Sequence, residues 1–115
     1  MTLIHEPTGL VLAEHLERAT TMFARLKGLL GRERLEPGHA LAIEPCTSIH
    51  TCFMRFAIDV LFVDRDGRVV RAISNLPPWR LTRIYSRAAL VVELPAGTLQ
   101  RAPVTEGDKL LLSAS

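Results

Sequence analysis

The chain has 115 residues, 48% of them hydrophobic, and its 14 basic and 12 acidic residues give a formal net charge of +2. This length predicts one domain, residues 1–115, with a core large enough to fold without disulfides or a structural metal, and the hydrophobic fraction excludes a disordered chain. The balanced charge and the scattered arginines argue against a nucleic-acid-binding protein.

The sequence contains neither a recognisable targeting signal nor a membrane span. The first residues lack a basic region followed by a long apolar run, and no window reaches the ~18 apolar residues that a membrane-spanning helix needs. We therefore expect a cytoplasmic protein in which Cys46 and Cys52 stay reduced.

The first third of the chain predicts one short strand and the main helix. Leu10–Ala13 is an apolar run typical of a short strand. From about residue 17 to residue 30, apolar residues recur at spacings of three and four, which predicts a helix with one apolar stripe packed on the core. The stripe consists of Leu16, Ala19, Met22, Phe23, Leu26, Leu29 and Leu30.

The rest of the chain predicts mostly strands. Asp66-Gly67 between two apolar runs is a hairpin signal, and Pro95-Ala96-Gly97 opens a turn or a short helix near 97–102. Strands are expected at 40–43, 49–55, 58–64, 68–73, 90–94 and 109–112. The fold class is therefore α+β, with a mostly antiparallel, barrel-like sheet that hides its strand edges.

Residues 46–54 are rich in sulfur and imidazole. If they formed one straight strand, Cys46, His50, Cys52 and Met54 would share a face because side chains alternate. Such a face suits Cu(I) or zinc, but residues two apart on a strand lie ~6.6 Å apart, so only neighbours such as His50 and Cys52 could share an ion. These two are weak metal candidates, and no cofactor is predicted. The alternative is that both cysteines and Met54 are core residues and His50 is a hydrogen-bonded histidine.

Two carboxylates, Asp59 and Glu93, lie inside apolar strands. Burial of a carboxylate is costly unless it is paired or hydrogen-bonded. Each acid either faces an arginine or caps a turn, or else one of them lines a pocket with His50, where burial would raise its pKa. The sequence leaves both interpretations open.

Trp79, the single tryptophan, stands beside Arg80 in a proline-containing loop. An aromatic ring next to a guanidinium is a typical platform for a sugar, a planar ligand or a peptide. The equally weighted alternative is that Trp79 plugs one end of the expected barrel.

Four stretches of the sequence resemble one family. They are RLKGLLGR at 25–32, IHTCFMRFAIDVLFVD at 49–64, VELPAG at 92–97 and EGDKL at 106–110. In this order they resemble the domain of unknown function 192 family, some of whose members are exported, and the 49–64 block is the specific one. The resemblance implies a single domain with a β-barrel-like sheet and one or two helices. It implies no activity, substrate or catalytic residue.

These observations lead to three functional hypotheses. The first is a non-enzymatic binding module for a small polar ligand, a glycan or a peptide, with a pocket formed by His50, Met54, Asp59, Trp79, Arg80 and Glu93. The second is a small hydrolase- or lyase-like enzyme that uses His50 with Asp59 or Glu93. The third is a metal-binding or assembly protein, the latter pairing an exposed strand edge with a partner.

Overall fold

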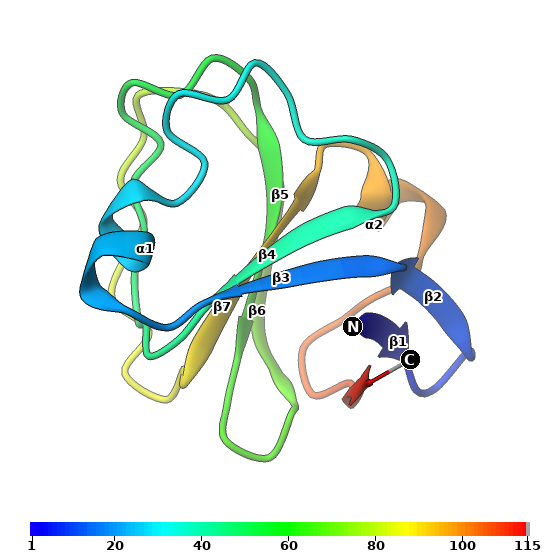
Figure 1. Cartoon of the computed structure of the whole chain (residues 1–115). Helices are drawn as coiled ribbons and strands as arrows, with labels where there is room; N and C mark the ends of the chain where they lie inside the picture. Colours follow the sequence, from blue (N-terminus) through cyan, green and yellow to red (C-terminus); the bar gives the residue numbers. More distant parts are fainter. Residues whose placement is uncertain (115) are drawn as a thin grey trace.

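Two β-sheets and two short helices form the structure, a computed structural model that describes residues 1–114 (Figure 1). The elements in chain order are β1 (Thr2–His5), β2 (Leu10–Ala13), β3 (His15–Ala19), α1 (Met22–Lys27), β4 (His39–Ile43), β5 (Ile58–Val63), β6 (Val69–Leu76), β7 (Leu90–Pro95), α2 (Thr98–Arg101) and β8 (Leu110–Ser113). None of the helices in the described residues is long and apolar enough to cross a membrane.

The two sheets are open, so the predicted barrel is wrong, while the α+β class is confirmed. The smaller sheet has the strand order β2-β1-β8 and the larger one β3-β4-β7-β5-β6. All neighbouring strands are antiparallel except β3 and β4, which run parallel.

The β5–β6 hairpin forms where the sequence predicts it. All six residues of β5 are buried, as expected for a nearly continuous apolar run, interrupted only by Asp59, in a central strand. At the turn, Asp64 Oδ1 accepts the backbone N–H groups of Asp66 and Arg68, both at 2.9 Å. Gly67 supplies the positive φ of 83° that the turn requires.

The predicted helix over residues 17–30 is wrong. His15–Ala19 instead forms β3, which pairs with β4 along its whole length, from His15 opposite His39 to Ala19 opposite Ile43. The helix begins only after Thr21, whose hydroxyl accepts the backbone N–H of Ala24 at 3.1 Å. It is six residues long, and Met22, Phe23 and Leu26 are 73%, 78% and 71% exposed, so three of the seven residues of the expected core stripe face outward.

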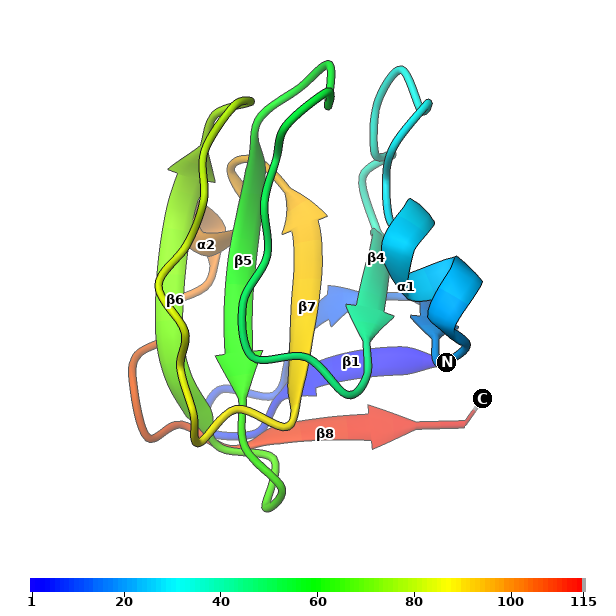
Figure 2. The same cartoon turned by 90° about the vertical axis from the view of Figure 1, so that its left-hand side faces the viewer.

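The larger sheet separates two hydrophobic cores. One face, here called the sheet-packed face, carries Leu61, Val63, Val92 and Leu94 and packs on the smaller sheet through residues such as Leu3. The opposite face, here called the loop-covered face, carries Leu41, Ile43, Val60, Phe62 and Val91. Figure 2 shows that α1 and the loop segments 46–57 and 77–89 lie over this face of the sheet.

The two covering loops are fastened together at Thr51. Its hydroxyl donates to the carbonyl of Pro77 at 2.6 Å and accepts the N–H of Arg80 at 2.9 Å, and its own N–H donates to the Arg80 carbonyl at 2.8 Å. The strand expected at 49–55 is therefore wrong: this segment has only an isolated bridge between His50 and Leu81. Because backbone hydrogen bonds here go to a loop rather than to a strand, the face shared by Cys46, His50, Cys52 and Met54 does not form.

Candidate ligand-binding cavity

A cavity of about 520 Å³ lies on the loop-covered face. Its walls come from α1 and the turn after it, from the end of β4 and from the segment 45–50, with Glu93 of β7 among the lining residues. Most of the wall is apolar, including Leu26, Leu29 and Ile43. A volume of this size is in the range of small-molecule sites in proteins.

Glu93 is the distinctive polar group of this cavity. It lies opposite Val60 in the β5–β7 pairing, on the loop-covered face, and is only 3% exposed. Within residues 1–114, its Oε1 is a buried oxygen with no hydrogen-bond partner. Burial raises the pKa of Glu93 to about 7, although the Arg32 guanidinium acts in the opposite direction. Oε1 is therefore an unused acceptor on a carboxyl group whose pKa is raised to near neutrality.

Gly28, at the end of α1, leaves room above this carboxyl group. Its φ is 48°, and a Cβ built on it would lie 3.9 Å from Glu93 Oε1 and 4.0 Å from Ile43 Cδ1. A side chain here would therefore narrow the approach to Glu93 as well as strain the backbone.

The other titratable groups of the lining surround this acid. The Cys46 thiol donates to the Ser48 carbonyl at 3.0 Å. Its pKa is raised, first by burial and also by the negative charge of Glu93, so Cys46 is not an activated thiolate. Arg25 and Lys27 supply positive charge at the α1 wall.

Three of the six candidate site residues line this cavity: His50, Met54 and Glu93. His50 is exposed, whereas Met54 is 6% exposed and belongs to the core beneath the loops. His50 therefore reaches solvent and the cavity at once, and Met54 contributes apolar wall.

Asp59 lies elsewhere. It is paired with Leu94 and thus belongs to the sheet-packed face, opposite to the face that carries Glu93. Its Oδ1 accepts the N–H of Asn75 at 2.7 Å and its Oδ2 the N–H of Leu99 at 2.8 Å. Both oxygens are used to hold β6 and the start of α2, which is the turn-capping role that the sequence allowed.

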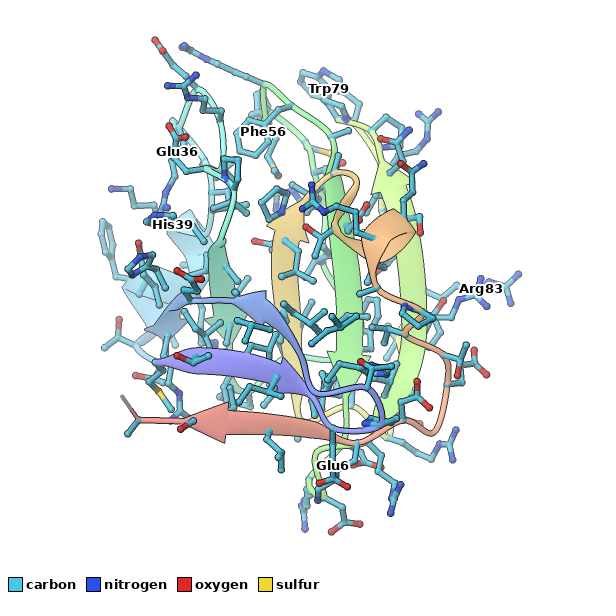
Figure 3. The ribbon with its side chains drawn as sticks, turned by 90° about the vertical axis from the view of Figure 1, so that its right-hand side faces the viewer. Glu6, Glu36, His39, Phe56, Trp79 and Arg83 are labelled. Carbon is cyan, nitrogen blue, oxygen red and sulfur yellow. The ribbon has the colours of Figure 1, made fainter. Side chains whose placement is uncertain are left out.

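Trp79 and Arg80 are both exposed and are not part of the cavity wall. The indole packs on Phe53, with 4.7 Å between ring centroids and an interplanar angle of 60°. Figure 3 shows Trp79 beyond the strand ends, far from Arg83. The cavity thus brings together His50 and Glu93 of the predicted pocket but not Trp79.

The metal hypothesis finds no cluster to support it. Cys52, one of the weak candidates, is half-buried and absent from the cavity wall that contains His50. In the described part of the chain, no group of three or more His, Cys, Asp or Glu side chains could hold an ion.

Sequence reasoning missed the contributions of Cys46, Gly28 and α1 to the cavity. The helical spacing predicts Met22 and Leu26 as core residues instead. The signal that could have found them is the length of the helix: Thr20-Thr21 and Gly28 bracket a segment too short to bury a stripe along a helix.

The chain is similar to proteins of one family. Residues 4–112 match the family DUF192, described as Uncharacterized ACR. A UPF0127 protein of Thermococcus gammatolerans is 34% identical over 112 residues, which cover 92% of this chain and 71% of that protein. A UPF0127 protein of Pyrococcus abyssi is 33% identical over 114 residues, 94% of each chain.

Two crystal structures share the fold. That of a "putative transcription regulator" from Sinorhizobium meliloti 1021 has a TM-score of 0.77 at 29% identity and covers 96% of this chain and 89% of that one. That of a protein of unknown function from Novosphingobium aromaticivorans has a TM-score of 0.76 at 22% identity and covers 97% and 93%. The two-sheet architecture therefore recurs in solved structures.

Proposed function

Because the chain belongs to the DUF192 family, whose description names no activity, we propose a function from the cavity itself: it binds a small molecule with an apolar body and a cationic amine, and the amine pairs with Glu93. The protein is then a non-enzymatic binding module. The unpartnered, buried Oε1 of Glu93 is the observation that carries this proposal.

The chemistry of the wall selects this class of ligand. An ammonium group would give Glu93 the hydrogen bonds and the opposite charge that it lacks, which makes its ionised form favourable despite burial. The apolar side chains of Leu26, Leu29 and Ile43 would contact the ligand body. Arg25 and Lys27 favour a ligand whose outer end is neutral or anionic, such as a zwitterion or the amino end of a peptide.

Binding is tested with a series of linear alkylamines and the alcohols of the same chain length, measured by isothermal calorimetry at neutral pH. We expect the amines to bind and the alcohols to bind at least about tenfold more weakly, because an alcohol brings no charge to Glu93. Glu93→Gln should abolish the difference between the two series. The exposed Glu14 provides the control variant, Glu14→Gln, which should bind as the native chain does. Equal binding of both series by the native protein contradicts the proposal.

A second candidate, an enzyme of the hydrolase or lyase type, is favoured by one observation: Glu93 has a pKa of about 7 in a cavity that His50 also lines. A carboxyl group with a pKa near the working pH is suited to act as a general base. Asp59 plays no part in this version, since both of its oxygens are already used. His50→Ala separates the two functions: retained amine binding with loss of turnover of a bound ester or amide would indicate the enzyme.

A further inference from the structure

Three segments on one side of the molecule contain basic residues and no acidic ones. The segments 21–27, 46–57 and 77–89 contain six basic residues and no acidic one, so the rest of the chain holds eight of the 14 basic and all 12 acidic residues. Figure 2 shows these three segments on the same side. The six basic residues are Arg25, Lys27, Arg55, Arg80, Arg83 and Arg87.

These charges are also free of ion pairs. Among residues 1–114, the arginine–glutamate pairs use Arg18, Arg32, Arg34 and Arg71, all outside the three segments. A chain with a net charge of only +2 thus carries a local excess of positive charge on these three segments.

The same segments expose large apolar side chains. On α1 these are Met22, Phe23 and Leu26, which are 73%, 78% and 71% exposed. On the loops, Phe53, Trp79, Leu81 and Ile84 are 71%, 60%, 79% and 75% exposed. So many exposed large apolar groups on neighbouring segments indicate a binding surface.

The backbone holds two of these side chains outward. Phe53 and Trp79 have φ values of 67° and 66°, a left-handed conformation that bulky residues rarely adopt and that is costly unless the surroundings impose it. Here the hydrogen bonds of Thr51 to Pro77 and Arg80 fasten the two loops on either side of the paired rings.

We propose that this face, formed by α1 and the loop segments 46–57 and 77–89, binds the surface of a membrane that contains anionic lipids. Arginine and lysine side chains would contact lipid phosphates, while the aromatic and aliphatic side chains enter the boundary between headgroups and acyl chains. Trp79 suits this position because its ring is apolar with one polar N–H.

The shape of the surface favours a lipid over a macromolecular partner. Its apolar side chains come from three segments, with only Phe53 and Trp79 described as a pair of rings in contact, and a fluid lipid boundary accepts them without matching pockets, whereas a protein partner must supply such pockets. Single-stranded nucleic acid stacks its bases on rings, but Met22, Leu26, Leu81 and Ile84 are aliphatic and offer no stacking face. The face shares the α1 residues with the cavity wall, but the proposal does not require the amine site, since Glu93 itself is buried beneath this surface.

The test uses vesicles of phosphatidylcholine with and without phosphatidylserine, and the emission of Trp79 as the probe. We expect sedimentation with the phosphatidylserine vesicles, a blue shift of the emission on binding, weaker binding as salt rises, and little binding to phosphatidylcholine alone. Glu93→Gln should bind these vesicles as the native chain does, so a failed amine site and a failed membrane surface are distinguishable.

Two pairs of variants assign the effect to this face. Leu81→Ser with Ile84→Ser should weaken partitioning about tenfold or more, whereas Leu10→Ser with Val11→Ser, at positions of β2 that are 43% and 50% exposed, should not. Arg83→Glu should weaken it by at least about fivefold, and Arg65→Glu, outside the three segments, much less. Thermal unfolding verifies that each variant is folded.

Three results would overturn the proposal. The first is no association with the phosphatidylserine vesicles at low salt. The second is association without a blue shift and without any effect of the Leu81 and Ile84 changes, which would indicate simple charge adsorption. The third is binding of a single-stranded oligonucleotide or a polyglutamate peptide in the absence of vesicle binding.

Discussion

Asp59 and Glu93 occupy neighbouring strands of the same sheet, yet their surroundings differ completely. Their exposures are 1% and 3%, and in the β5–β7 pairing Asp59 lies opposite Leu94 while Glu93 lies opposite Val60. Asp59 accepts two backbone N–H groups on the sheet-packed face. Glu93 leaves Oε1 without a partner in the described residues, next to a cavity on the loop-covered face. The comparison teaches that burial alone does not identify a functional acid; the partners of its oxygens do.

The largest effect should come from the acid whose oxygens are used. Asp59→Ala leaves the N–H groups of Asn75 and Leu99 without an acceptor, and at about 1–3 kcal/mol for each unpaired buried donor we expect a loss of roughly 3–5 kcal/mol in the free energy of unfolding. Urea denaturation measures it. Glu14→Ala, at an exposed position, is the control and should change little. A loss as small as that of the control would contradict a stabilising role for the two hydrogen bonds that Asp59 accepts.

Glu93→Gln should instead stabilise the protein above neutral pH. The folded carboxyl has a pKa of about 7 against a reference value of 4.5, so the unfolded chain ionises first and stability falls as pH rises from 4.5 through 7. The full cost, about 3 kcal/mol, is present above that pH. The variant should gain this amount at about pH 8 and nothing below about pH 4.5. Denaturation curves at both pH values check it, and a gain that does not depend on pH would contradict the raised pKa.

The stability of the two loops over the loop-covered face should depend on Thr51. Thr51→Val removes a donor to the Pro77 carbonyl and an acceptor for the Arg80 N–H, and we expect a loss of about 2 kcal/mol in unfolding free energy. Because 46–57 includes cavity residues such as His50, amine binding should weaken in parallel. Thr20→Val, at an exposed position, is the matched control. Unchanged stability would show that the loops are held by packing alone.

The smallest change in unfolding free energy should come from the exposed cavity residue Leu26. Leu26 is 71% exposed and Leu29 is 2% exposed, so Leu26→Ala should cost less than about 0.5 kcal/mol in unfolding free energy and Leu29→Ala about 2–5 kcal/mol. Thermal unfolding of the two variants side by side measures the difference. Similar losses of unfolding free energy for both variants would indicate that Leu26 is a core residue, as the helical spacing predicts.

The sequence was sufficient for the centre of the fold. The nearly continuous apolar run Ile58–Val63, followed by Asp66-Gly67, predicts a buried strand and a hairpin, because both signals are local. It failed at 17–30, where Leu16 and Ala19 have the spacing of a helix but form β3 against β4. A spacing of three is shared by a helix face and by a short irregularly buried strand, and only the parallel pairing partner decides between them.

The candidate site could be predicted only in part for a related reason. Ile-Asp-Val and Val-Glu-Leu look alike in sequence, and alternation within each strand is visible there, but the relative register of β5 and β7 is not. That register places the two acids on opposite faces. The position of Trp79 outside the cavity likewise depends on loop hydrogen bonds to Thr51, which no spacing in the sequence encodes.

The most direct test of the account is a titration of the Glu93 carboxyl carbon by NMR, without amine and with a saturating alkylamine, with Glu93→Gln to assign the signal. The account predicts a midpoint at a pKa of about 7 in the free protein and a clear decrease when amine is bound, because the cation favours the ionised carboxylate. A midpoint near the ordinary value of 4.5 in the free protein, or one that the amine leaves unchanged, would contradict it.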